Sequence, residues 1–240
     1  MSTENDTKST TSTFMHTLII LAIYSIIFVL LFIFIYDPTG SIGNIFAILF
    51  GAVAIGYIVT ILYYRMTVGG VDKSEMKTIL LTNAASYMVL FVTMVSISIN
   101  PKLVTIFENT IGIWYLSIMG NDSFVNEIFQ SKIFSQMDNE SINDSELVNY
   151  GFLLTRLNQN NIDDFIEFYR NNTDNDKSNV EFPLDFKPNF KNDNNAVKNG
   201  QLIKLKELVT TKRSVGYFMW VYLTAIISQM ISMIAVTMKI

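Results

Sequence analysis

The chain has 240 residues, of which 50% are hydrophobic and only 16% are charged, and its formal net charge is −4. Soluble domains carry roughly a quarter charged residues, and here the apolar residues are gathered into long runs, which excludes one ordinary globular core. The negative charge gives a nucleic-acid partner no electrostatic support. The absence of cysteine excludes disulfides, thiolate nucleophiles and cysteine zinc sites. The sequence therefore predicts an integral membrane protein with one modest polar domain.

The first apolar run follows a polar N-terminal segment. Residues 1–16 are mostly polar and rich in serine and threonine, and we expect them to be a disordered tail. Residues 17–36 hold twenty residues without a charge, which is the helix length that a bilayer core of about 30 Å requires. Because Asp37 and Pro38 end this run without a small-residue cleavage pattern, we expect a retained span and not a signal peptide.

Two further spans complete the three transmembrane helices expected within residues 17–100. The second, residues 45–64, contains small residues at a spacing of four, which allows close approach of helix backbones. The helix-packing candidates are Ala47, Gly51, Ala52 and Gly56. The third, residues 78–99, ends before Pro101, because proline disfavours helix at the residue that precedes it.

Residues 101–120 admit two interpretations. The apolar stretch 103–119 is at the lower length limit for a span, and its Glu108 is costly at depth, so an interfacial or re-entrant helix is favoured. Positive-inside counting favours a true span, because the basic residues of 65–77 and 204–213 would then share one side of the membrane. Both alternatives remain open, and the expected architecture is a mainly α bundle of four or five transmembrane helices.

The same stretch supplies the candidate packing or partner contacts, which are Glu108, Asn109, Gly112, Trp114 and Tyr115. On a helix, Glu108, Gly112 and Tyr115 share a face, and Gly112 leaves room beside Glu108 for a close neighbour. A buried carboxylate beside a small residue suggests docking to a partner group. A surface glutamate that snorkels is the alternative. The aromatic rings of Trp114 and Tyr115 are suited to an interface depth.

A small, mostly helical polar domain is expected over residues 121–213, inserted before the last span. Its helices are predicted near 144–157 and 161–170, from apolar residues at helical spacing. Residues near 171–200 form either an extended arm that lays aromatic rings on a neighbouring surface or an irregular loop on their own domain. Residues 214–240 hold the C-terminal transmembrane helix.

The entry of the last span carries basic and aromatic residues. Such side chains favour the membrane–water interface. The expected membrane-interface anchors are Lys212, Arg213, Tyr217 and Trp220.

No pattern in the sequence indicates catalysis or cofactor binding. His16 is the only histidine, Asp163 and Asp164 are neighbours that point in different directions on a helix, and no phosphate loop or metal-ligand spacing occurs. We therefore expect a protein that is not an enzyme and holds no cofactor or metal. A small multi-span ion channel or transporter with Glu108 in its pathway is the alternative function.

Two short blocks carry a family resemblance. FENTIG at residues 107–112, followed by WY at 114–115, resembles a stretch of membrane-anchored minor capsid proteins of nucleocytoplasmic large DNA viruses. KRSVG at residues 212–216, with Trp220 and YL at 222–223, is similar to the entry of their last membrane helix. The order of apolar helices, FENTIG stretch, polar domain and final span also agrees.

This resemblance implies a structural protein of the virion's internal membrane, beneath the capsid, that ties the bilayer to the icosahedral shell. The implied partners are the lipid bilayer, the major capsid protein and other minor capsid proteins, with a homo-oligomer as a further expectation and no nucleic acid. None of the family's residues is catalytic, so the resemblance implies no enzymatic role.

Overall fold

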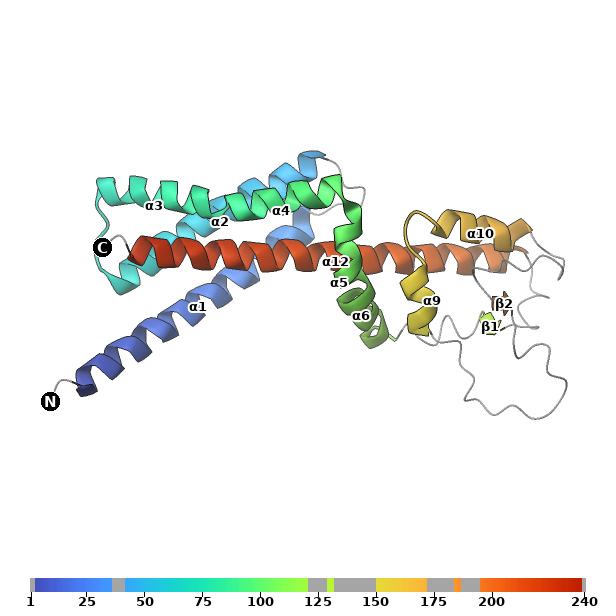
Figure 1. The fold of residues 1–240 in the computed structure, drawn as a ribbon, viewed down its shortest axis with the longest axis horizontal. Coiled ribbons are helices and arrows are strands. Elements are labelled where there is room, and N and C mark those ends of the chain that lie inside the picture. Colours follow the sequence, from blue (N-terminus) through green and yellow to red (C-terminus); the bar gives the residue numbers. More distant parts are fainter. Residues whose placement is uncertain are drawn as a thin grey trace. The chain divides into compact units, whose positions relative to one another are not determined.

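The computed structural model describes residues 3–35, 42–120, 129–131, 150–171, 184–186 and 195–238. In chain order the elements are α1 (Thr3–Ile35), α2 (Ile42–Thr67), α3 (Lys73–Ser86), α4 (Met88–Ile99), the 3₁₀-helix η1 (Pro101–Val104), α5 (Thr105–Phe107), the π-helix η2 (Glu108–Gly112), α6 (Ile113–Ile118), β1 (Phe129–Ser131), α9 (Tyr150–Arg156), α10 (Ile162–Asn171), β2 (Leu184–Phe186) and α12 (Asn195–Thr237) (Figure 1). The described part of the chain is mainly α-helical, as the sequence predicts.

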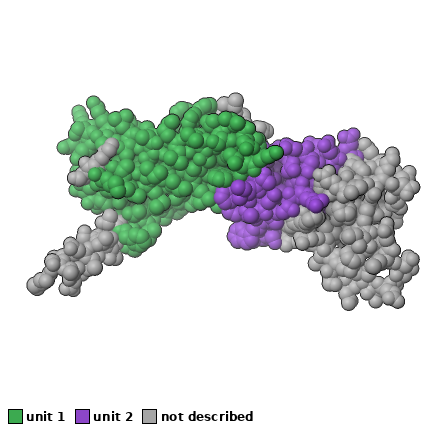
Figure 2. Space-filling view, in the orientation of Figure 1, with its two compact units in different colours: residues 1–103, 218–240 green, residues 104–217 purple. Residues whose placement is uncertain are grey.

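The chain divides into two compact units, which Figure 2 colours separately. Unit 1 comprises residues 1–103 and 218–240, and unit 2 comprises residues 104–217. The long helix α12 contributes to both, because its residues up to Tyr217 belong to unit 2 and those from Phe218 belong to unit 1.

Four helices among the described residues are long and apolar enough to cross a membrane. They overlap the four runs that the sequence predicts as definite spans, with one or both ends differing by one or more residues. Their bounds are Phe14–Ile35, Phe46–Thr67, Lys73–Ile99 and Gly200–Thr237. The apolar stretch 103–119, for which the sequence left a fifth span open, is not one of these helices.

The first helix is longer than the sequence predicts. It begins at Thr3, so residues 3–16 are helical where the composition predicted a disordered tail. The prediction neglected helix propagation: once the apolar run has formed a helix, each added residue gains a hydrogen bond without a new nucleation cost. Serine and threonine lower this gain by only about 0.5 kcal/mol each relative to alanine, so they do not force a stop.

Within unit 1, α3 and α4 form one 27-residue helix. The backbone N–H of Tyr87 donates to Asn83 O, and the N–H of Phe91 donates to Tyr87 O, both at 3.0 Å, so the hydrogen-bond ladder continues through Tyr87. The preceding turn is fixed by Glu75, whose carboxylate accepts from the Asp72 backbone N–H at 2.7 Å and from the Tyr64 hydroxyl at 3.0 Å.

Unit 2 has its own hydrophobic core, built from α6, α9, α10 and the first half of α12. The buried residues of this cluster are Leu116, Leu153, Leu154, Leu157, Ile162, Phe165, Ile166, Leu202, Leu205, Leu208 and Val209. The helix predicted near 161–170 is confirmed by α10. Of the helix predicted near 144–157, the structure describes the second half as α9, and residues 144–149 lie outside the described residues.

The turn between α9 and α10 is closed by asparagine side chains. The Oδ1 of Asn161 accepts from the Asn158 backbone N–H at 2.8 Å, and the Oδ1 of Asn158 accepts from the Asn160 N–H at 2.9 Å. Asparagine favours turns because its side chain replaces backbone hydrogen-bond partners in this way. The turn brings the apolar faces of α9 and α10 into the same core.

Two short strands pair within unit 2. Strands β1 and β2 are antiparallel, with Phe129 opposite Phe186 and Ser131 opposite Leu184. Strand β2 lies inside the arm predicted near 171–200, so this part of the arm is extended and its backbone pairs with its own domain. Most of the remaining arm lies outside the described residues.

Candidate contact site around Glu108 and Lys212

The helical stretch from Pro101 to Ile118 changes its winding at the residues that the sequence singled out. After the 3₁₀-helix η1 and the short α5, residues Glu108–Gly112 form a π-helix, and α6 follows. Segments of π-helix are rare in proteins and occur frequently at functional sites. This segment holds Glu108, Asn109 and Gly112, three of the predicted contact residues.

One face of the stretch is buried. Val104, Glu108, Gly112 and Leu116 recur at a spacing of four and are all buried in the structure. Leu116 belongs to the core cluster of unit 2, and the half-buried Tyr115 packs against the same cluster. The predicted carboxylate is therefore an interior group and not a snorkelling surface glutamate, since Glu108 is only 4% exposed.

The partner of Glu108 is Lys212, which lies on α12. The Nζ of Lys212 is 3.3 Å from Oε1 of Glu108, and the lysine side chain is fully buried. Both residues belong to unit 2. A buried carboxylate alone would cost several kcal/mol in an apolar interior, so the ion pair accounts for the presence of both charges there.

The ammonium of Lys212 has three further acceptors. It donates to the carbonyl oxygens of Leu154 and Leu157, the latter at 2.8 Å, and to Oδ1 of Asn109 at 3.1 Å. The last carbonyls of a helix lack intrahelical partners, and a basic side chain at a helix C-terminus satisfies them while opposing the helix dipole. Lys212 thus closes the C-terminus of α9 and joins it to the FENTIG segment.

Two glycines make this arrangement sterically possible. A Cβ on Gly112 would lie 2.6 Å from the carbonyl oxygen of Lys212, and a Cβ on Gly216 would lie 2.7 Å from the backbone nitrogen of Glu108. Real Cβ atoms do not approach other atoms this closely. Each glycine follows a charged residue by four positions, so one glycine on each helix accommodates the charged residue of the other.

No protein-family model, curated protein or solved structure matches the chain.

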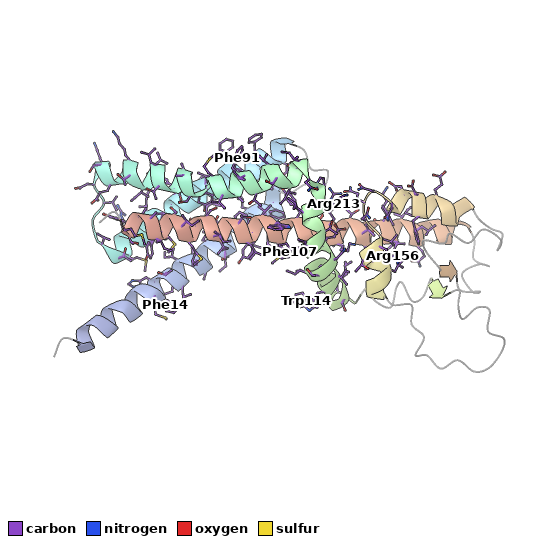
Figure 3. The ribbon with its side chains drawn as sticks, viewed as in Figure 1. Phe14, Phe91, Phe107, Trp114, Arg156 and Arg213 are labelled. Carbon is purple, nitrogen blue, oxygen red and sulfur yellow. The ribbon has the colours of Figure 1, made fainter. Side chains whose placement is uncertain are left out.

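The two blocks that carry the family resemblance meet at this site. Residues 107–112 supply the carboxylate and the first glycine, and residues 212–216 supply the ammonium and the second glycine. Figure 3 shows the side chains of both helices, with Phe107 and Arg213 labelled. The sequence singled out both blocks separately and did not predict that they contact each other.

The predicted membrane-interface anchors need one correction. Lys212 is not an exposed anchor, because its ammonium is buried and bound to protein groups that compensate its charge. Arg213 is half-buried and donates from Nη1 to Oε1 of Gln159. Tyr217 and Trp220 are half-buried, and Trp220 donates its indole N–H to the carbonyl oxygen of Leu103 at 2.7 Å.

The remaining predicted contact residue in the FENTIG region, Trp114, points away from the core. Its side chain is 64% exposed and projects outward from α6 (Figure 3). The structure therefore separates the five predicted contact residues: Glu108, Asn109 and Gly112 meet Lys212, Tyr115 packs on the core, and Trp114 is exposed.

The small residues of α2 serve two neighbours in unit 1. A Cβ on Gly51 would lie 2.8 Å from a methyl of Leu31 in α1, and a Cβ on Gly56 would lie 2.2 Å from the Tyr87 hydroxyl. Ala52 is fully buried, whereas Ala47 is exposed and does not pack as predicted. The small residues make room for large side chains from neighbouring helices.

A polar network inside unit 1 was not predicted from the sequence. The hydroxyls of Tyr87 and Tyr24 hydrogen-bond at 2.7 Å, and Tyr87 also lies 3.0 Å from Oε1 of Gln229. The network continues to Thr60, which accepts from Gln229 Nε2 at 3.1 Å and contacts Ser232 at 3.3 Å.

From Ser232 on α12 the network returns to the helix formed by α3 and α4 and to α2. The Ser232 hydroxyl donates to Oδ1 of Asn83 at 3.1 Å, and Asn83 Nδ2 donates to the carbonyl oxygen of Val53 at 3.1 Å. Asn83 and Gln229 were visible in the sequence as polar residues within apolar runs, which was the available signal. Hydrogen bonds of this kind hold membrane helices together.

Groups of other potential ligands are sparse in the described residues. No cluster of three or more His, Asp or Glu residues that could hold a metal ion occurs among them. His16 is half-buried on α1, and Asp163 forms an exposed ion pair with Lys206. The arrangement around Lys212 is a packing site whose chemistry is charge compensation and helix capping.

Proposed function

We propose that the protein is a structural membrane protein that anchors a protein shell to a lipid bilayer, as a minor capsid protein of a virion's internal membrane does. The observation that carries this proposal is the continuity of α12, which runs unbroken from Asn195 in unit 2 to Thr237 in unit 1. A single helix thus connects a folded polar unit to a candidate span. This is the architecture that a tether requires.

The distribution of apolar side chains supports insertion in a bilayer. Several large apolar residues on the candidate spans are between 68% and 84% exposed, among them Phe34, Phe50, Leu81 and Ile99. Soluble proteins rarely expose such residues over a continuous surface. The same helices bury hydrogen-bonded polar side chains on their inner faces, which is the arrangement expected where the surrounding solvent is lipid.

The ion pairs of unit 2 support four crossings over five. The positive-inside argument for a fifth span depended on the basic residues before the last helix. Two of them are paired with carboxylates of their own unit, Lys206 with Asp163 and Lys212 with Glu108. Lys212 is fully buried in the protein and cannot act as an interfacial charge, which weakens the positive-inside argument for a fifth span.

Unit 2 is the part of the chain that we expect to contact the shell. Its hydrophobic core and its buried ion pair give it an independent interior, and α10 exposes acidic residues to solvent. The resemblance to minor capsid proteins supplies the class of partner, namely the major capsid protein and other minor capsid proteins. The residues that carry the resemblance lie in the interior of unit 2, so in this proposal they stabilise the fold of the unit and do not contact the shell themselves.

The proposal is tested in purified particles. If the chain is a minor capsid protein, it is recovered in them at a fixed ratio to the major shell protein. After the lipid is removed with mild detergent it should sediment with the shell. Extraction as a free monomer under these conditions would contradict the tether. A matched control is a membrane protein of the same particles without a polar unit, which should leave with the lipid.

The transport alternative loses its main support. It required Glu108 in a pathway through the spans, and this carboxylate is paired with Lys212 in unit 2. The polar groups within the spans that the structure describes as a network are uncharged and bond to one another. They favour helix packing over an ion pathway.

A further inference from the structure

The helical stretch 104–118 has a second face, opposite the one that holds Glu108. Large apolar side chains on this face are between 61% and 64% exposed. They are Ile106, Trp114 and Ile118. The other exposed residues of the stretch are the small polar residues Thr105, Thr110 and Ser117. The face is therefore apolar and uncharged.

Other helices of the same unit provide an internal comparison. The exposed face of α10 carries Asp163, Asp164 and Glu167, and the exposed residues of α12 in this unit include Lys206 and Glu207. These are faces that water solvates well. Between residues 104 and 120 the only charged residue is Glu108, and it is buried. A water-facing role does not explain such a face.

The position of the stretch in the chain indicates what covers it. The candidate span α3–α4 ends at Ile99, and only Asn100 and the 3₁₀-helix η1 separate it from α5. Leu103, the last residue of unit 1, accepts the indole N–H of Trp220 on the last candidate span. The stretch thus follows the end of one candidate span along the chain, and the residue before it bonds to Trp220, a residue type that is enriched at membrane–water interfaces.

We propose that this apolar face, formed by Ile106, Trp114 and Ile118, lies on the lipid bilayer at the boundary between headgroups and acyl chains. The inference rests on the membrane location in the proposed function and adds a specific lipid contact of unit 2. Interfacial helices bury an apolar face in this boundary, and tryptophan is favoured there. The opposite face is held by Lys212, so the helix lies between lipid and the interior of unit 2.

This contact gives a role to the π-helical segment and its ion pair. They hold the carboxylate inside the protein, because a carboxylate that faced the lipid would be costly. The outer face is then free of charge. The membrane contact and the buried ion pair thus occupy opposite faces of the same helical stretch.

The two tryptophans of the chain allow a direct test. The full-length protein is reconstituted into phosphatidylcholine vesicles, with and without lipids brominated near the headgroup end of the acyl chain. A Trp220→Phe variant retains Trp114 as its only tryptophan. We expect brominated lipid to reduce Trp114 emission at least twofold, and aqueous iodide to quench it several-fold less than an exposed control. The control is Asp164→Trp in a chain that lacks both native tryptophans.

The outcomes separate this inference from the proposed function. If iodide quenches Trp114 as strongly as the control and brominated lipid does not, the lipid contact is wrong. If neither quenches it, the face is covered by another copy of the chain, and the lipid contact is again wrong. The Trp114→Phe variant reports on Trp220. Absence of lipid quenching there would contradict membrane insertion itself, whereas its presence would leave the proposed function standing.

A second label covers the case in which Trp220→Phe does not fold. The chain has no cysteine, so Ile118→Cys and Asp164→Cys each accept one spin label with both tryptophans intact. We expect the label at position 118 to collide more often with oxygen than with a water-soluble nickel complex. The label at position 164 should show the reverse. Equal behaviour of the two labels would overturn the proposal.

Discussion

Gly112 and Gly216 hold equivalent positions on two crossing helices, and each lies against the backbone of the charged residue that precedes the other glycine by four positions. The close approach that they permit brings Glu108 within 3.3 Å of Lys212. The ion pair and the glycine pair therefore form one site, and each part can be tested separately.

Gly112→Ala and Gly216→Ala should each destabilise unit 2 by about 1–3 kcal/mol, because the added methyl meets backbone atoms that cannot move aside cheaply. Gly200→Ala is the matched control on α12. Its Cβ would meet no atom within 4 Å, and replacing a helical glycine by alanine stabilises by about 0.5–1 kcal/mol. Hydrogen exchange of the α9 and α12 amides in detergent micelles measures these changes. Equal effects of the three variants would contradict the reciprocal contact.

Lys212→Met should destabilise unit 2 by about 3–5 kcal/mol, since it leaves a buried carboxylate without its counter-charge. It also removes the donor to the carbonyls of Leu154 and Leu157. Lys206→Met is the control, because the ion pair of Lys206 with Asp163 is exposed and such pairs contribute below about 1 kcal/mol. Denaturant titration of the two variants gives the comparison. A small effect of Lys212→Met would mean that the lysine is solvated.

Glu108→Gln should cost less than Lys212→Met, because the remaining ammonium keeps its three oxygen acceptors. Lys212→Met alone leaves the Glu108 carboxylate without a counter-charge, whereas the double variant has no carboxylate at this position. The two losses should therefore sum to more than the loss of the double variant, as expected for residues in contact. Strict additivity in the same titration would show that the two side chains do not interact.

Tyr87→Phe should destabilise unit 1 by about 1 kcal/mol, which is within the range measured for hydrogen bonds between membrane helices. The hydroxyl that is lost contacts both Tyr24 and Gln229. Tyr63→Phe is the matched control, because its hydroxyl has a longer contact, at 3.4 Å, with Thr17. Unfolding of both variants by dodecyl sulfate in mixed micelles measures the difference. A larger effect at Tyr63 would place the stabilising contacts elsewhere.

The proposed four crossings predict that the turn between α2 and α3 and the residues of unit 2 lie on opposite sides of the bilayer. Single cysteines at Ser74 and Asn160, both exposed, report on these two segments in a chain that has no other thiol. In sealed vesicles, an impermeant maleimide should label one site only, and permeabilisation should expose the other. Labelling of both sites from the same side would indicate that residues 103–119 cross the membrane.

The sequence predicted those features that depend on local composition. The four long apolar helices follow from runs of about twenty uncharged residues, because bilayer thickness sets that length. Glu108 was recognisable because a carboxylate within an apolar run is uncommon. Gly112 was recognisable as a residue without a side chain that leaves room for a neighbour beside Glu108. These inferences needed no knowledge of distant parts of the chain.

The partner of Glu108 could not be predicted in this way, because Lys212 lies about one hundred positions further along the chain. The neighbouring contact of Lys212 with Asn109 joins residues 103 positions apart. Lys212 was predicted to be an interface anchor because it precedes an apolar run. In the structure its ammonium is instead buried and paired with Glu108. The common signal is a charged residue followed by glycine four positions later, which occurs in both blocks. The three-residue strands β1 and β2 carry too few residues for any periodicity.

The π-helical segment Glu108–Gly112 also fixes the number of residues that this site can hold. An α-helix turns about 100° per residue, so residues spaced by four drift about 40° per step and Val104 would face about 120° away from Leu116. The wider turn of a π-helix reduces this drift, which keeps Val104, Glu108, Gly112 and Leu116 on one buried face. Deleting a single residue here would restore the α-helical winding with Val104 and Leu116 still about 20° apart, but it would break the four-residue spacing of Glu108 and Gly112 on which the contacts with Lys212 and Gly216 depend. The segment should therefore tolerate substitutions on its outer face far better than any change in its length.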